Sequence, residues 1–480
     1  MLFNSFEFLV FFAIVVISFF LLPHRWRWLH LLIASCIFYM AFIPIYILIL
    51  FVTIIVDYIA GILIENATGA KRKMLLGLSL VTNIGILAVF KYFNFFISNI
   101  NSLGYGIPLL KIILPIGLSF HTFQAMSYTI EVYRGRQKAE RHFGIYALYV
   151  MFFPQLVAGP IERPQNVLPQ FHEKKQFDAG NLTSGLKLIL WGLFKKVVIA
   201  DRLALVTDFA FKNLHDQTSL TLMIAVVFFS FQIYCDFSGY SDIALGTARV
   251  LGFRLMKNFD APYQSASVSE FWRRWHISLS TWFRDYLYIS LGGNRVSIPR
   301  WYFNLFFVFL VSGLWHGANW TFIIWGAIHG CYLIFGILLE KLSSKVNWNM
   351  PPIWVQWLYR PVRVLVTFIL VCFAWIFFRA ASVSDAWLVV HKITSLDSMG
   401  LSRGDVHGLA DTYLGMPLWN FALTTSLIPV LLLADHLLKN RRFMERFSTS
   451  GVRYMVYFLL IFAVIFLGTY SQNRFIYFQF

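Results

Sequence analysis

Stretches of apolar residues long enough to cross a lipid bilayer recur along the whole sequence. A helix needs about 20 such residues to cross the hydrocarbon core. Only 13% of the residues are charged, whereas a soluble domain carries about 25%, so a soluble globular enzyme is excluded. We therefore predict an all-α, polytopic membrane bundle of about 11–12 transmembrane helices. The stretches lie at about 6–22, 29–43, 45–64, 75–98, 112–131, 183–200, 218–235, 300–314, 319–339, 361–378, 417–435 and 452–470.

The net charge of +17 falls in short basic clusters between the apolar stretches. Such clusters mark cytoplasmic loops, so we place the clusters at 71–73 and 134–141 in the cytoplasm. We therefore expect the positive charge to face the lipid bilayer, and we expect no nucleic acid as a partner. The four cysteines are isolated, and the sequence predicts neither a disulfide framework nor a metal site. We expect one membrane domain over residues 1–480.

Three further apolar runs, at 143–158, 240–253 and 282–292, are too short or too charged to span a bilayer. Non-helical or short segments at membrane depth are tolerated only where protein or a wet cavity surrounds them. We predict re-entrant or interfacial segments at these three places.

Residues 271–295, FWRRWHISLSTWFRDYLYISLGGNR, form the most informative stretch. On a continuous helix, His276 shares one face with the aromatic residues, and Arg273, Arg274 and Arg284 lie on the rest. An interfacial helix with a tryptophan belt and snorkelling arginines explains the aromatic and basic residues. It does not explain an imidazole turned toward the bundle, so His276 is either a structural hydrogen-bonding group or part of a site.

Residues 312–330, SGLWHGANWTFIIWGAIHG, place His316, Asn319 and His329 in sequence that is apolar enough to span. Ionisable groups inside a membrane are functional candidates by default. On a continuous helix His316 and His329 are about 220° and about 20 Å apart, which excludes a shared site. We favour His316, whose neutral imidazole is suited to take a proton from a hydroxyl that attacks an acyl group. A proton relay in a transporter is the alternative.

Glycines recur around these histidines. The spacing of Gly313 with Gly317, and of Gly326 with Gly330, allows a neighbouring helix or a ligand to approach the backbone closely. The run from Gly292 to Arg295 indicates either an anion-binding nest or an ordinary turn.

Charged residues also occur beside apolar spans upstream. Asp236 and Asp242, in YCDFSGYSD, are expected to form structural ion pairs, with Arg273 or Arg274 as partners. Arg163, in FPQLVAGPIERP, is suited to hold a phosphate or carboxylate, and an exposed turn is the alternative there.

Taken in order, these motifs resemble the membrane-bound O-acyltransferase (MBOAT) family, in its bacterial alginate O-acetylation branch, most densely over 150–335. The resemblance implies a helical bundle with re-entrant helices around a funnel, where an acyl donor and an acceptor meet at a histidine. By motif, His316 in LWHGA matches the essential histidine, His276 in FWRRWH matches a second active-site position, and Arg163 matches an arginine required in that branch.

The resemblance also implies an enzyme of the inner membrane with no bound cofactor, which passes acetyl groups from acetyl-CoA to an extracytoplasmic polysaccharide such as alginate, or to peptidoglycan. An SGNH-type acetyltransferase outside the membrane is the expected partner. Other acyl donors, a D-alanyl group among them, a proton-coupled transporter or flippase, and a scaffold are the alternatives. The expected donor-binding residues are Arg163, Arg284, Arg295 and Asn319.

Overall fold

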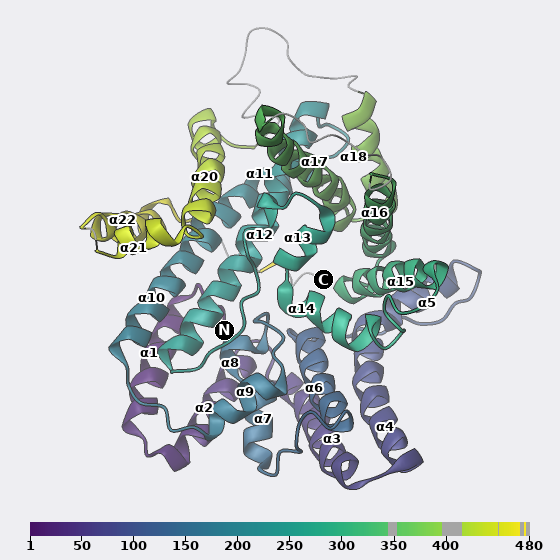
Figure 1. The fold of residues 1–480 in the computed structure, drawn as a ribbon, viewed down its shortest axis with the longest axis vertical. Helices are drawn as coiled ribbons and strands as arrows, with labels where there is room; N and C mark the ends of the chain where they lie inside the picture. Colours follow the sequence, from purple (N-terminus) through teal and green to yellow (C-terminus); the bar gives the residue numbers. More distant parts are fainter. Residues whose placement is uncertain (344–352, 396–414, 450, 471–474, 477–480) are drawn as a thin grey trace. The chain divides into compact units, whose positions relative to one another are not determined.

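The computed structural model describes residues 1–343, 353–395, 415–449, 451–470 and 475–476, and every regular element in these ranges is a helix (Figure 1). Seven of the described helices are long and apolar enough to cross a bilayer, and Phe6–Leu21 and Val452–Leu467 are shorter apolar helices. The predicted all-α membrane bundle is therefore confirmed. The seven are Pro44–Asn66, Gly69–Asn101, Ser219–Val250, Ile298–His316, Trp320–Ser343, Tyr359–Arg379 and Leu418–Leu437.

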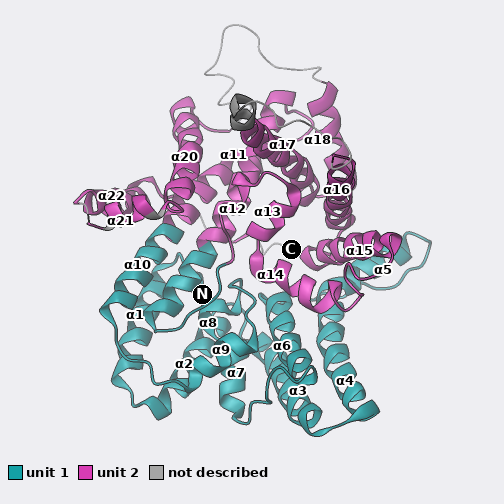
Figure 2. Ribbon diagram, in the orientation of Figure 1, with its two compact units in different colours: residues 1–192, 240–257 teal, residues 193–239, 258–480 magenta. Residues whose placement is uncertain are grey.

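The chain forms two compact units that interleave in sequence (Figure 2). Unit 1 consists of 1–192 and 240–257, and unit 2 consists of 193–239 and 258–480. The 32-residue helix α12 (Ser219–Val250) begins in unit 2 and ends in unit 1. That residues 1–480 act as one domain stays a prediction.

In unit 1, α3 packs against both α4 and α6, and polar side chains join these helices inside the bundle. The carboxylate of Asp57 accepts hydrogen bonds from Ser79 Oγ at 2.6 Å and Asn83 Nδ2 at 2.8 Å. A buried carboxylate needs such donors in lipid. The helices of this unit are α1 (Phe6–Leu21), α2 (His24–Met40), η1 (Pro44–Tyr46), α3 (Ile47–Asn66), α4 (Gly69–Leu87), η2 (Ala88–Tyr92), α5 (Phe93–Asn101), α6 (Leu118–Tyr133), α7 (Phe143–Met151), α8 (Phe153–Leu156), α9 (Pro164–His172), α10 (Ala179–Leu193) and the last part of α12.

Unit 2 carries the tryptophan- and histidine-rich sequences. Its described helices are η3 (Phe194–Ala200), α11 (Asp201–Lys212), the first part of α12, η4 (Pro262–Gln264), α13 (Val268–Arg274), α14 (Ile277–Trp282), η5 (Phe283–Tyr288), α15 (Ile298–His316), α16 (Trp320–Ser343), α17 (Ile353–Arg379), α18 (Val383–Ser395), α20 (Leu418–Leu437), α21 (Arg441–Thr449), α22 (Val452–Phe462) and η6 (Ala463–Leu467).

Of the three predicted re-entrant or interfacial segments, two are built from short helices. The first contains α7 and α8, and the third contains η5. The prediction for 240–253 is wrong, because α12 continues to Val250 without a break. One 18-residue apolar window of this helix is 78% buried by protein.

Helices α15 and α16 form a tight hairpin at the predicted glycines. A Cβ atom on Gly326 would lie 3.2 Å from the Cα atom of Gly313 and 3.0 Å from the carbonyl carbon of Phe309. Small residues allow this approach, and close backbone packing stabilises helix pairs where lipid removes the hydrophobic effect. The glycines therefore pack the two helices together.

We expect Gly326→Leu to destabilise the hairpin by more than about 3 kcal/mol, because backbone atoms on the opposite helix cannot move aside. Thermal melting in detergent, with the yield of monodisperse protein, measures this. Gly336→Leu on the same helix is the matched control, since a Cβ atom there meets nothing within 4 Å. Equal melting of the two variants would contradict the close approach.

Candidate active site

The helix predicted over 271–295 is interrupted at His276. Helix α13 ends at Arg274, α14 begins at Ile277, and His276 between them has a left-handed backbone (φ +43°). Such a φ is unfavourable for a residue with a Cβ and persists only where the surroundings impose it. The continuous-helix prediction is therefore wrong, although His276 is buried in the bundle as expected.

Asn258 holds this interruption in place. Its carbonyl oxygen accepts the backbone N–H of Ile277 at 2.9 Å, and its side-chain oxygen accepts the hydroxyl of Ser278 at 2.9 Å. Asn258 is itself 1% exposed. The Ile277 N–H is one of the donors at the start of α14 that have no partner inside the helix, and both bonds hold the two residues that directly follow His276.

His316 is the last residue of α15, and the chain leaves the helix at Gly317 before α16 begins at Trp320. The second continuous-helix prediction is therefore also wrong. Because the chain reverses there, His316 and His329 both contact the ring of Trp325, each at 5.0 Å between ring centroids. The two histidines belong to one aromatic cluster, which the spacing along a straight helix had excluded.

His276 and His316 come together in this cluster, with 6.4 Å between their ring centroids. His316 also contacts Trp315 at 5.0 Å and Phe378 at 5.4 Å, and its side chain is almost completely buried. His276 packs edge-on against Phe237 at 4.6 Å. Four segments, from α12, the α13–α14 break, the α15–α16 hairpin and α17, thus enclose two imidazoles with aromatic rings.

His329 has a positioning partner within the same cluster. Trp272 Nε1 donates to His329 Nδ1 at 3.2 Å, so Nδ1 is the acceptor nitrogen of this imidazole. The two rings meet edge to face at 5.0 Å. His329 therefore links α13 to α16 behind the pair formed by His276 and His316.

The predicted donor-binding residues of unit 2 lie outside this cluster. Asn319 accepts the backbone N–H of Thr321 at 3.1 Å, as a helix cap does, and donates to Ala381 O at 3.0 Å. Arg284 is exposed and pairs with Asp285 at 2.8 Å. Arg295 is exposed in the turn that begins at Gly292. Donor binding by these residues stays a prediction.

The prediction that Asp236 forms an ion pair with Arg273 or Arg274 is wrong. Asp236 pairs with Lys196 Nζ at 2.6 Å, and the same ammonium group lies 2.8 Å from Asp201 Oδ1, with all three side chains buried. Arg274 pairs instead with Glu270 at 2.5 Å, and Arg273 donates to Ser269 Oγ at 3.2 Å. A π-helical turn, η3, carries Lys196 into the interior, and no local pattern specifies that turn.

Two of the remaining predicted residues lie in unit 1. Asp242 is half-buried on the last part of α12, and Arg163 is half-buried at the start of α9. Beside Arg163, the buried carboxyl of Glu162 accepts the backbone N–H of Met256 and the amide of Asn166. Burial raises the pKa of Glu162 to about 7, and the hydrogen bonds oppose that rise.

We expect this carboxyl to make stability pH-dependent. The pKa of Glu162 is higher in the folded chain than its ordinary value of 4.5, so the folded state keeps this proton to a higher pH than the unfolded state does. The stability that the protonated carboxyl gives the folded state is therefore complete below pH 4.5. It is lost as the pH rises to about 7, at about 1.4 kcal/mol per pH unit. In thermal melting from pH 5 to 8, Glu162→Gln should remove this slope. The surface variant Glu173→Gln should keep it, and parallel slopes in all three proteins would refute the assignment.

Sequence reasoning missed Asn258, Trp325 and Lys196. The lysine carried a signal, because it lies in the apolar stretch 183–200, where a charge is costly. Asn258 lies in a loop and Trp325 in an apolar helix, so their neighbours follow only from the tertiary structure. Among the described residues, no three His, Cys, Asp or Glu side chains gather to hold a metal ion.

Comparison with known proteins assigns a class to this fold and histidine cluster. The profile of the membrane-bound O-acyltransferase family, MBOAT, matches residues 136–380. The chain belongs to this family and is an acyltransferase. Membership of this family supports the predicted enzyme over the two alternatives, a transporter and a scaffold.

Particular relatives are similar over most of their length. The probable alginate O-acetylase AlgI of Pseudomonas aeruginosa is 40% identical over 423 residues, which cover 85% of this chain and 78% of the relative. The peptidoglycan O-acetyltransferase of Helicobacter pylori is 37% identical over 409 residues, which cover 79% of this chain and 75% of the relative. The teichoic acid D-alanyltransferase of Bacillus subtilis is 27% identical over 277 residues, which cover 55% of this chain and 68% of the relative.

Proposed function

We propose that this enzyme transfers an acetyl group from acetyl-CoA across the inner membrane for the O-acetylation of an extracytoplasmic glycan, such as alginate or peptidoglycan. The observation that carries the proposal is the buried pair of His276 and His316 in a chain of the MBOAT family. The names of the relatives favour acetyl over D-alanyl, because the similarity at 37–40% is to O-acetylating proteins.

His316 is the proposed general base. A neutral imidazole accepts the proton of a hydroxyl as that hydroxyl attacks the thioester carbonyl, and it returns the proton to the leaving thiolate. His316 ends α15, and the carbonyl end of a helix favours the positive charge that a base acquires. The surrounding rings exclude water, which limits hydrolysis of the thioester.

His276 is the proposed second site residue. Its imposed backbone conformation holds the imidazole beside His316, where it can orient the acceptor or donate to the carbonyl oxygen of the donor. An SGNH-type acetyltransferase outside the membrane is the proposed next acceptor. Arg163, Arg284, Arg295 and Asn319 are the proposed donor contacts.

Transfer of label in membrane vesicles tests the function. Vesicles that contain the chain and an SGNH-type partner receive acetyl-CoA labelled in the acetyl group, and label is followed into the partner and the glycan. Parallel vesicles receive a D-alanyl carrier protein. Label from acetyl-CoA alone supports the proposal, label from the D-alanyl carrier alone assigns the other donor, and label from neither contradicts the proposed reaction.

A further inference from the structure

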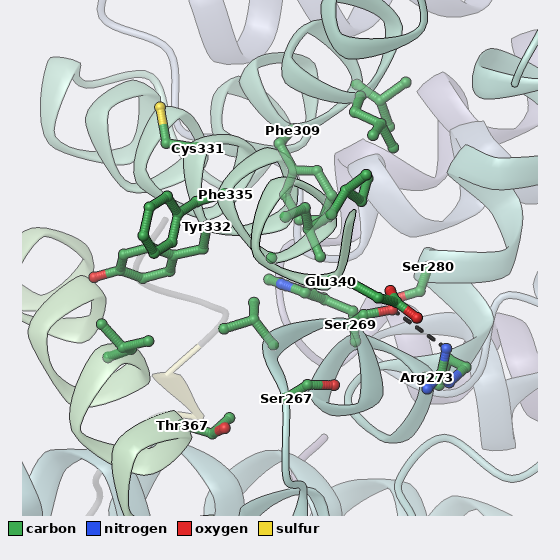
Figure 3. A pocket seen from close by; sticks show the side chains of 18 of the residues that line it. Ser267, Ser269, Arg273, Ser280, Phe309, Cys331, Tyr332, Phe335, Glu340 and Thr367 are labelled. Atoms are coloured by element: carbon green, nitrogen blue, oxygen red, sulfur yellow. Dashed lines mark hydrogen bonds between the residues drawn. The ribbon is translucent and has the colours of Figure 1, made fainter. Parts of the chain in front are cut away.

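Unit 2 contains a groove of about 1600 Å³ beside the histidine cluster. Figure 3 shows Tyr332 and Phe335 at the left of the groove and Phe309 above its centre, whereas Ser269, Arg273 and Glu340 lie toward the right. The groove therefore has an apolar part and a polar part.

The apolar wall belongs to spanning helices and is exposed. Phe335 is 60% exposed and Leu339 is 49% exposed on α16, and Val366 is 50% exposed on α17. In a bilayer, side chains exposed on spanning helices meet lipid rather than water. An occupant of this wall is therefore an acyl chain.

The lining of the groove carries more positive than negative charge. Arg273, Arg284 and Arg363 line the groove, and Glu340 is the one acid among the described lining residues. Arg273 donates to Ser269 Oγ, and Arg363 Nε donates to Ala266 O at 3.1 Å. A guanidinium has five N–H donors, so further donors of both arginines are available for a phosphate oxygen.

The ends of the helices place the part of the groove at Glu340 and Ser343 at the cytoplasmic side. Helix α15 begins at the end of the hairpin where α16 finishes, and basic residues mark that end: Arg300 in the first turn of α15 and Lys341 in the last turn of α16. A basic end is the cytoplasmic end. The cytoplasmic leaflet is the one that carries anionic lipid.

We propose that this groove binds an anionic phospholipid, with its phosphate at Arg273 and Arg363 and its acyl chains along α16 and α17. Trp272 forms part of the groove wall and donates to His329. A bound lipid therefore supports the indole that positions one histidine of the cluster. Arg284, one of the proposed donor contacts, also lines the groove, so acetyl-CoA is the competing occupant that the test has to distinguish.

Lipid titration in detergent tests the proposal, with phosphatidylglycerol and phosphatidylcholine of identical acyl chains as probes and bound lipid counted by native mass spectrometry. Wild type is expected to bind phosphatidylglycerol about 25-fold more tightly, about fivefold for each of two cations. Arg273→Gln/Arg363→Gln should abolish that preference. Arg300→Gln, an exposed arginine outside the groove, should retain it.

A second variant fills the groove without disturbing the fold. Gly336 lines it, and a Cβ atom there meets nothing within 4 Å, so Gly336→Leu should fold and lose the bound phosphatidylglycerol. Gly77→Leu, an equally open glycine on α4, is the control. Equal binding of both lipids to wild type, or undiminished binding to Gly336→Leu, would overturn the proposal. Displacement of phosphatidylglycerol by acetyl-CoA would overturn it too, by assigning the groove to the acyl donor.

Discussion

Replacement of His316 is expected to lower acyl transfer by about 10²- to 10⁴-fold, the range that a general base contributes. His316→Gln keeps much of the side-chain volume inside the ring cluster and removes the base, whereas His316→Ala also leaves a cavity. Both variants should lose the rate, and only the alanine variant should also lose melting temperature. Initial rates of acetyl transfer at matched amounts of folded protein measure the effect.

The control for this experiment is His215→Ala, because that histidine is exposed in the turn between α11 and α12 and lies in the same unit. Its rate should equal that of wild type. A His316→Gln enzyme that transfers acetyl at the wild-type rate would remove His316 from the role of base while leaving the acyltransferase class intact.

Lys196→Met is expected to destabilise the chain by about 3–5 kcal/mol, the cost of removing one partner from a buried ion pair. Lys196 lies within 2.8 Å of both Asp201 and Asp236, so its loss leaves two buried carboxylates without their shared cation. Melting temperature and the yield of folded protein report the effect. We expect little folded protein at 37 °C.

Removing a carboxylate as well should restore part of the stability. In Lys196→Met/Asp236→Asn one negative charge is gone, and the amide can still accept the backbone N–H of Ile476, which donates to Asp236 at 2.7 Å. Lys187→Met, an exposed lysine on α10, is the control. A Lys196→Met protein as stable as the Lys187→Met protein would show that the buried charges are not coupled.

Hydrophobicity alone determined the class of fold, because only helices satisfy backbone hydrogen bonds inside lipid. It also identified the residues with functional potential, since a histidine at 276, 316 or 329 is costly in apolar surroundings unless it has a role. The role of the glycines in the α15–α16 hairpin was also predictable, from their spacing along the sequence. Glycines four residues apart let another helix backbone come close, as it does here.

The tertiary structure decided how these residues meet. A period of 3.6 residues assumes an unbroken helix, and it failed at His276 and at Gly317. The interruptions there bring His276 beside His316, and bring His316 and His329 against the ring of Trp325. The contacts that impose these interruptions come from residues distant in sequence, such as Asn258. The partner of Asp236 was likewise decided by a π-helical turn that directs Lys196 inward. Local sequence determined which side chains need a partner, and long-range packing determined which partner each of them has.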